Sequence, residues 1–231
     1  MSNSQNRVIT YNVTQDIITS SLEKKTITLN FTGYLYQKNN RYIYFEKPAY
    51  KQKVEDGAIL LSANGSNISL MQVDTDSLQS IIYTNFDSLE QRMSKFDVSK
   101  RTCLNNFEAD WQKWDLLPDT MIKNGFHCQK ATHTNVNGVL DWEVWFCPDI
   151  LVRAGVLDLK NLPGLLVEAQ FISINKHYSL ASQTTGIAIP DTVFWPNEFN
   201  VPVTKGVVLK NHGVRKPTKA QKQNDLLNNN N

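Results

Sequence analysis

The sequence lacks long hydrophobic runs, has few cysteines and carries almost no net charge. No segment approaches the ~18 apolar residues of a membrane-spanning helix, so no membrane span is predicted. Lys and Arg number 24 against 22 Asp and Glu, a net charge of +2. This balance gives no electrostatic basis for nucleic-acid binding. Three cysteines are too few for a disulfide framework, and the odd count leaves at least one thiol free unless it pairs between chains.

Signatures of catalysis, metal binding and cofactor binding are also missing. The chain has no G-x-S-x-G, Walker, dinucleotide-binding, H-E-x-x-H or C-x-x-C motif. His127 and Cys128 are neighbours, but adjacent residues of a strand point to opposite faces and cannot both bind one ion. The sequence therefore predicts no metal site, no cofactor and no catalytic residue.

The abundant feature is alternation of apolar and polar residues with a period of two. In residues 26–32, Ile27, Leu29 and Phe31 share one face, which predicts a half-buried strand. Asn39-Asn40 and Asn64-Gly65 predict tight turns. Further strands are predicted over residues 41–45, 58–61, 67–73 and 79–84. We expect one mainly β domain over residues 1–209, a curved antiparallel sheet or open barrel-like fold with one long loop.

Little helix is expected. The best candidates are residues 86–98, where Leu89, Met93 and Phe96 have roughly helical spacing, and residues 216–227 near the end. Residues 210–231 are basic and rich in Asn, and we expect a disordered tail there. Residues 1–7 are polar and lack the apolar core of a signal peptide. We expect either a cytoplasmic protein or a numbering that begins after a removed signal.

Residues 126–147 predict a hairpin centred on a two-residue type I′ turn at Asn137-Gly138. In that register residue i faces residue 275 − i, which collects apolar side chains on one face and polar ones on the other. Cys128 then faces Cys147 at a separation that a disulfide accepts. The alternatives are a disulfide and two thiols packed as small apolar side chains. His133, near Trp142, is interpreted as a partly buried packing residue.

A connection of about 17 residues, 148–164, separates this hairpin from the strand predicted at 165–172. Connections of this length without regular structure are uncommon and often functional. Pro163-Gly164 is typical of a type II turn, which needs a positive φ at the Gly. Arg153, in the middle of the loop, is expected to matter for partner binding and little for stability.

Asn161-Leu-Pro-Gly-Leu-Leu166 resembles the motif that names the GLPGLI family of exported proteins, found chiefly in Bacteroidota. Gly125-Phe-His-Cys-Gln-Lys-Ala131 resembles the family's cysteine-containing strand, and 142–150 resembles its tryptophan-containing strand with the acidic–Ile segment after it. Trp111 or Trp114 lies where the family often has a Trp, so the similarity spans about residues 111–172. The chain departs from the family at Asn161 and Leu166, where the motif has Gly and Ile, at 154–156, and after Ile150, where an expected Pro is absent.

The resemblance implies export to the periplasm or cell surface and supplies no known activity. The resulting hypothesis is a non-enzymatic cell-envelope protein that contacts an envelope partner or a small ligand through the 148–164 loop. Its candidate binding residues are Trp145, Asp149, Arg153, Leu162, Pro163 and Gly164. Two alternatives remain: a hydrolytic enzyme that uses Asp141 and Glu143, which lie two apart on one strand face beside Lys130, and an assembly or folding subunit of the envelope.

Overall fold

The structure is a computed structural model that describes part of the chain. The residues described are 6–18, 26–48, 51–55, 58–63, 66–70, 80–97, 100–106, 113–157, 159–196, 199 and 203–205. The Asn64-Gly65 turn, the predicted terminal helix at 216–227, the 210–231 tail and Trp111 lie outside these residues.

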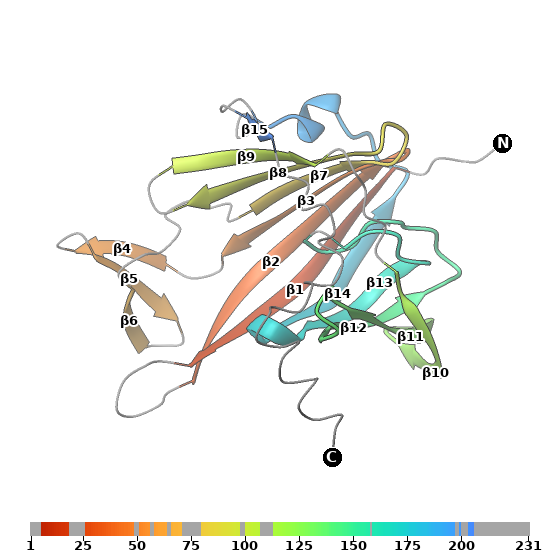
Figure 1. Ribbon diagram of the computed structural model, residues 1–231, viewed down its shortest axis with the longest axis horizontal. Helices are drawn as coiled ribbons and strands as arrows, with labels where there is room; N and C mark the ends of the chain where they lie inside the picture. Colours follow the sequence, from red (N-terminus) through yellow and green to blue (C-terminus); the bar gives the residue numbers. More distant parts are fainter. Residues whose placement is uncertain are drawn as a thin grey trace, which may run out of the picture.

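The chain forms one large curled sheet that does not close into a barrel (Figure 1). Its 12 strands lie in the order β10-β11-β12-β13-β14-β1-β2-β3-β7-β8-β9-β15. Neighbours are antiparallel except β15 and β9, which are parallel. The strands are β1 (Arg7–Ile18), β2 (Thr26–Lys38), β3 (Arg41–Pro48), β7 (Ser80–Asn85), β8 (Glu90–Asp97), β9 (Lys100–Asn106), β10 (Asp115–Lys123), β11 (Phe126–Thr134), β12 (Leu140–Cys147), β13 (Leu165–Phe171), β14 (Lys176–Thr185) and β15 (Val203–Lys205).

A second sheet has three strands, β4 (Lys51–Glu55), β5 (Ala58–Ala63) and β6 (Ser66–Leu70). Two short 3-10 turns also occur in the described part of the chain, η1 (Ile172–Ile174) and η2 (Asp191–Phe194). The prediction of a mainly antiparallel, curved β fold with little helix is confirmed. The pairing of β14 with β1 joins the strands of the second half of the chain to those of the first.

Local chemistry explains the tight turns. Asn39 adopts φ 57° between β2 and β3, as expected of an Asn in a hairpin. Asn124 and Gly125 adopt φ 51° and 80° between β10 and β11, the pattern that a type I′ turn requires. The sequence therefore carries an Asn-Gly hairpin at 124–125 that the strand pattern alone did not reveal.

The helix predicted at 86–98 is wrong. Residues 86–89 form a turn in which Leu89 takes φ 53°, and β8 begins at Glu90. β8 pairs with β7 on one side and β9 on the other. Pairing on both edges satisfies the strand's backbone groups and outweighs a weak helical spacing.

The two faces of the large sheet bury two separate apolar clusters. The larger cluster packs alternate residues of β1, β2, β3 and β12–β14, including Ile9, Tyr11 and Leu35, against the connection between β12 and β13. The smaller cluster uses the opposite face, where Ile43, Ile81 and Tyr83 pack against residues from the 187–199 segment. The face that carries the larger cluster is called the inner face below.

Candidate functional site

The 148–164 loop is mostly interior rather than exposed. Its buried residues pack into the inner-face cluster; they are Val152, Ala154, Val156, Leu159 and Leu162, each at most 4% exposed. Backbone bonds fold the loop on itself: Gly155 N–H donates to Leu159 O at 2.9 Å and Leu162 N–H donates to Arg153 O at 3.2 Å. The loop therefore fills part of the core of the curled sheet.

Polar contacts tie the loop to strands that are far apart in the sheet. Arg153 N–H donates to the Tyr42 hydroxyl of β3 at 3.4 Å. The Arg153 guanidinium lies 4.2 Å from the centre of the Phe86 ring. Lys160 Nζ donates to Gln91 Oε1 of β8 at 3.1 Å. Because these partners belong to the β3–β7–β8 region while the loop leaves β12, the loop bridges the two halves of the curl.

The predicted type II turn at Pro163-Gly164 is wrong. Gly164 does not have a positive φ, whereas Asn161 does, at 56°. Gly164 is required for a different reason: a Cβ there would lie 2.1 Å from Cys147 O and 2.9 Å from Pro148 Cα. The backbone of the loop's end therefore passes directly against the backbone of its start, and only a residue without a side chain fits.

A buried ion pair lies across the inner face. Lys176 of β14 and Glu46 of β3 are 2.5 Å apart, and their side chains are 5% and 3% exposed. The Tyr44 hydroxyl donates to the other Glu46 oxygen at 2.9 Å. Lys176 also lies 4.7 Å from the centre of the Phe31 ring. Burial raises the pKa of both Tyr11 and Tyr44, because a phenolate would be stripped of water there.

The 126–147 hairpin has the predicted register but a different turn. Gln129 faces Phe146, Thr132 faces Glu143, and His133 faces Trp142. The tip is a type I turn followed by Gly138 at φ 75°, with Gly138 N–H donating to Asn135 O at 2.9 Å. The predicted two-residue type I′ turn is therefore wrong, and Thr134 faces Leu140 rather than Asp141.

That register shift separates the two carboxylates proposed for an enzyme. Asp141 is the extra residue in β12, and its carboxylate meets His133 Nδ1 at 2.7 Å. Glu143 instead pairs with Lys130 at 2.9 Å. His133 and Lys130 lie on opposite faces of β11, so the two acids do not form a pair. His133 is partly buried, and the centre of its ring lies 5.7 Å from the centre of the Trp114 ring, as expected of a packing residue.

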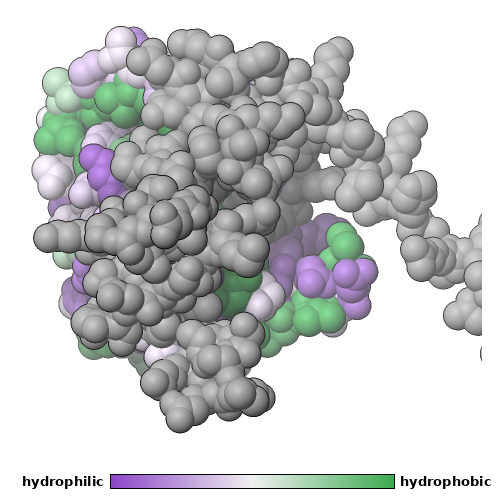
Figure 2. All heavy atoms as spheres, turned by 90° about the vertical axis from the view of Figure 1, so that its left-hand side faces the viewer, coloured by the Kyte–Doolittle hydropathy of each residue, from purple (hydrophilic) through white to green (hydrophobic). Residues whose placement is uncertain are grey.

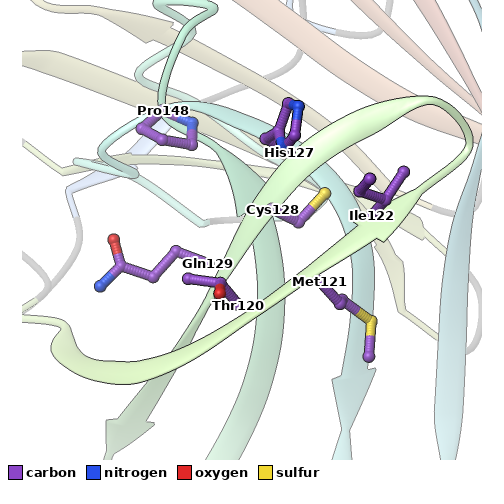
Figure 3. Close-up of a pocket in the computed structure, with 7 residues that line it drawn as sticks. All are labelled: Thr120, Met121, Ile122, His127, Cys128, Gln129 and Pro148. Atoms are coloured by element: carbon purple, nitrogen blue, oxygen red, sulfur yellow. The ribbon is translucent and has the colours of Figure 1, made fainter.

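A cleft of about 340 Å³ opens beside the β10–β11 hairpin (Figure 3). It is lined by Thr120, Met121, Ile122, His127, Cys128, Gln129 and Pro148. Pro148, the first residue of the loop, forms one side of the cleft (Figure 3). Ile122 is 68% exposed and Met121 40% exposed, so the cleft presents apolar surface to solvent. On the face seen in Figure 2, the coloured surface carries apolar patches with hydrophilic residues between them.

Cys128 and Cys147 are free, buried thiols in the structure. Burial raises the pKa of Cys128, an effect opposed by a hydrogen bond from the Lys123 backbone to its sulfur. The neighbouring Cys147 thiol also raises the pKa of Cys128. A disulfide between them remains a prediction for material made under oxidising conditions.

The structure does not gather the six predicted binding residues on one surface. Leu162 and Gly164 are interior, Pro163 and Arg153 are half-buried, and Asp149 is exposed in the turn after β12. Trp145 is half-buried on the outer side of β12, with Lys123 Nζ 5.8 Å from its ring centre. Lys123 also forms an ion pair with Glu168. Sequence reasoning missed the cleft because its β10 side was not recognised as a strand.

Comparisons with known proteins give no information on function. No family model matches the chain, and no curated protein matches it. Among solved structures, the chain is similar to PNGF-II in two crystal forms, with TM-scores of 0.48 and 0.47 and sequence identities of 15% and 16%. The match covers 87% of this chain and 31% of that chain. None of the helices in the described part of the chain has the length and apolar character needed to cross a membrane.

Proposed function

We propose that this chain is a non-enzymatic, exported cell-envelope protein that binds a partner or small ligand at the surface where the 148–164 loop begins. The observation that carries the proposal is the cleft between Pro148 and the β10–β11 hairpin, which exposes Ile122 and Met121. Concave, largely apolar surfaces with a few polar groups are the usual form of a binding site. The exposed Leu151, 69% accessible, extends apolar surface along the same loop.

Burial limits the part of the 148–164 loop that a partner or ligand can contact. Leu162 and Gly164 are buried in the core, whereas Pro148, Asp149 and Leu151 are the exposed residues in the described part of the loop. Deleting the loop would remove core residues and unfold the protein, so point substitutions are the proper test. The resemblance to the GLPGLI family supports export, and Asn161 has a positive φ where that motif has a Gly, a residue type suited to the same conformation.

The test is recovery of a bound species by the tagged, natively expressed protein. We expect one species to co-purify with the wild type and to be lost from the Ile122→Asp and Leu151→Asp variants. Val136→Asp is the matched control, because Val136 is 91% exposed at the far tip of the 126–147 hairpin. Equal recovery by all four proteins would contradict the site. Cell fractionation tests export separately, and residence in the cytoplasm would contradict that part.

A further inference from the structure

Three sulfur-bearing side chains occupy one row across the neighbouring strands β10, β11 and β12. Met121 pairs directly with Cys128. Gln129 and Phe146 form the last pair between β11 and β12, and Cys128 and Cys147 are the next residues on the two strands, so continuing the register sets them opposite each other. Residues paired across adjacent strands project to the same side of a sheet, so the three side chains share one face.

We propose that Met121, Cys128 and Cys147 bind one Cu(I) ion. Thiolate and thioether sulfurs are soft ligands and favour Cu(I). Zinc instead takes cysteine, histidine and carboxylate ligands, and no group of three His, Cys, Asp or Glu suited to a metal occurs among the described residues. Facing residues of antiparallel strands lie about 4.5–5.5 Å apart at Cα, close enough for their sulfurs to share one ion with metal–sulfur bonds of about 2.3 Å.

The cleft supplies a route to this row. Cys128 and Cys147 are each 2% exposed, whereas Met121 is 40% exposed and lines the cleft together with Cys128. In Figure 3 the Met121 side chain extends away from Cys128, so it must turn about its rotatable bonds to complete the ligand set. An ion would therefore enter past Met121 and be capped by it.

Each thiol releases one proton to solvent on binding, and copper keeps its +1 state throughout. Two thiolates and one Cu(I) carry a net charge of −1. Lys123 lies beside Cys128, to whose sulfur its backbone N–H donates. The Lys123 ammonium group pairs with the Glu168 carboxylate, so the surroundings of Cys128 carry one charge of each sign.

Metal binding and disulfide formation exclude each other at this row. A Cys128–Cys147 disulfide transfers two electrons to an oxidant and releases two protons, which removes both thiolate ligands. Only the reduced protein is therefore expected to bind Cu(I). The inference does not depend on the proposed partner, because the purified chain alone contains all three ligands.

The test is anaerobic titration of the reduced protein with Cu(I), supplied as its acetonitrile complex, against the chelator bathocuproine disulfonate. We expect one ion per chain, with Cys128 and Cys147 protected from alkylation. Cys128→Ser and Cys147→Ser should abolish this binding. Met121→Leu, an isosteric change at an accessible side chain, should weaken Cu(I) binding by at least about tenfold. Even a residue that only hydrogen-bonds to a metal ligand contributes about that much to metal affinity.

Cys103→Ser is the matched control, because Cys103 lies in β9, near the opposite end of the sheet from β10, β11 and β12. It should bind Cu(I) as the wild type does. Failure of the reduced wild type to retain Cu(I) against the chelator would overturn the proposal. Wild-type affinity in Met121→Leu would overturn the three-sulfur site even if one cysteine variant failed to fold. If Ile122→Asp loses its partner but still binds Cu(I), the copper proposal stands and the partner site is shown to be independent of it.

Discussion

At the residue scale, the chain uses glycine and asparagine for two different purposes. Gly125 and Asn161 supply positive φ, at 80° and 56°. Gly164 is needed only because it has no side chain, since a Cβ there would lie 2.1 Å from Cys147 O. Sequence alone does not distinguish these roles, since a Pro-Gly pair signals a type II turn whether or not another strand passes close by.

The two roles predict different responses to substitution. Gly164→Val, and already Gly164→Ala, should destabilise the protein by about 1–3 kcal/mol, the usual cost of forcing atoms into a filled site. Gly164→Asn should be equally harmful, because the obstacle is backbone that cannot move aside. Gly125→Asn should be nearly neutral, because Asn tolerates positive φ and no atom lies within 4 Å of a Cβ there. Thermal melts of the variants would refute this account if Gly164→Asn matched the wild type.

The Lys176–Glu46 pair predicts a non-additive pair of substitutions. Lys176→Met leaves a carboxylate that is 3% exposed without its cation, and should cost about 3–5 kcal/mol. Adding Glu46→Gln removes that uncompensated charge while keeping an acceptor for the Tyr44 hydroxyl. The double variant should therefore recover most of the lost stability, as measured by denaturant unfolding. If the double variant lost as much stability as Lys176→Met, or the sum of the two single losses, the unpaired charge would not be the cause of the destabilisation.

At the element scale, period-2 alternation and Asn/Gly turns predicted the fold class and several strands, including β2, β3 and β7 in part. They did not predict β10, because Pro118 interrupts the apolar run and Asp115 to Lys123 is mostly exposed. The pairing in β10 shifts between Leu116 and Thr120, which is how an edge strand accommodates a proline. The cleft depends on β10, so it could not be predicted either.

The loop was predicted to be important, but its burial was not. Its apolar residues occur in short runs, such as 150–152, that follow neither a strand nor a helix period. The burial of the loop depends on partners more than 50 residues away in sequence, including Tyr42, Phe86 and Gln91. Arg153 shows the consequence, since its guanidinium lies 4.2 Å from the centre of the Phe86 ring. A residue expected to matter only for a partner therefore also holds the loop to the sheet.

Arg153→Ala should lower the free energy of unfolding by about 0.5–2 kcal/mol, the range of a cation–aromatic contact. Arg153→Lys should retain part of that stability, because a cation remains although the planar group is lost. Lys113→Ala, at an exposed position, is the control and should change little. Urea unfolding measures all three, and an unchanged midpoint for Arg153→Ala would show that the loop is held by its apolar residues alone.

At the scale of the whole molecule, the sheet stays open because its end strands, β10 and β15, do not pair with each other. The inner face is filled instead by the loop and by a layer of large side chains from four adjacent strands, among them Tyr11, Tyr44 and Tyr178, each fully buried. An open curl of this kind depends on those tyrosines remaining neutral and packed, because no ring of hydrogen bonds closes the structure.

This dependence predicts alkaline sensitivity. Burial raises the pKa of Tyr11 and Tyr44 well above the ordinary value of 10. Below the unfolded-state pKa, a tyrosine whose folded-state pKa is raised adds no pH dependence to the stability. Above about pH 10 the stability falls, because the unfolded chain releases protons that the folded chain retains. We therefore expect the contribution of these tyrosines to the free energy of unfolding to be flat from neutral pH to about 10 and to decline beyond it. The raised pKa of Cys128 adds a decline that begins near the ordinary thiol pKa of about 9. Ultraviolet titration should show that a subset of the eight tyrosines ionises only together with the loss of the β-sheet circular dichroism signal, whereas in denaturant all eight titrate as one group. Complete ionisation of all eight near pH 10 with the circular dichroism unchanged would show that the inner face is open to water and that the layer described here is not packed.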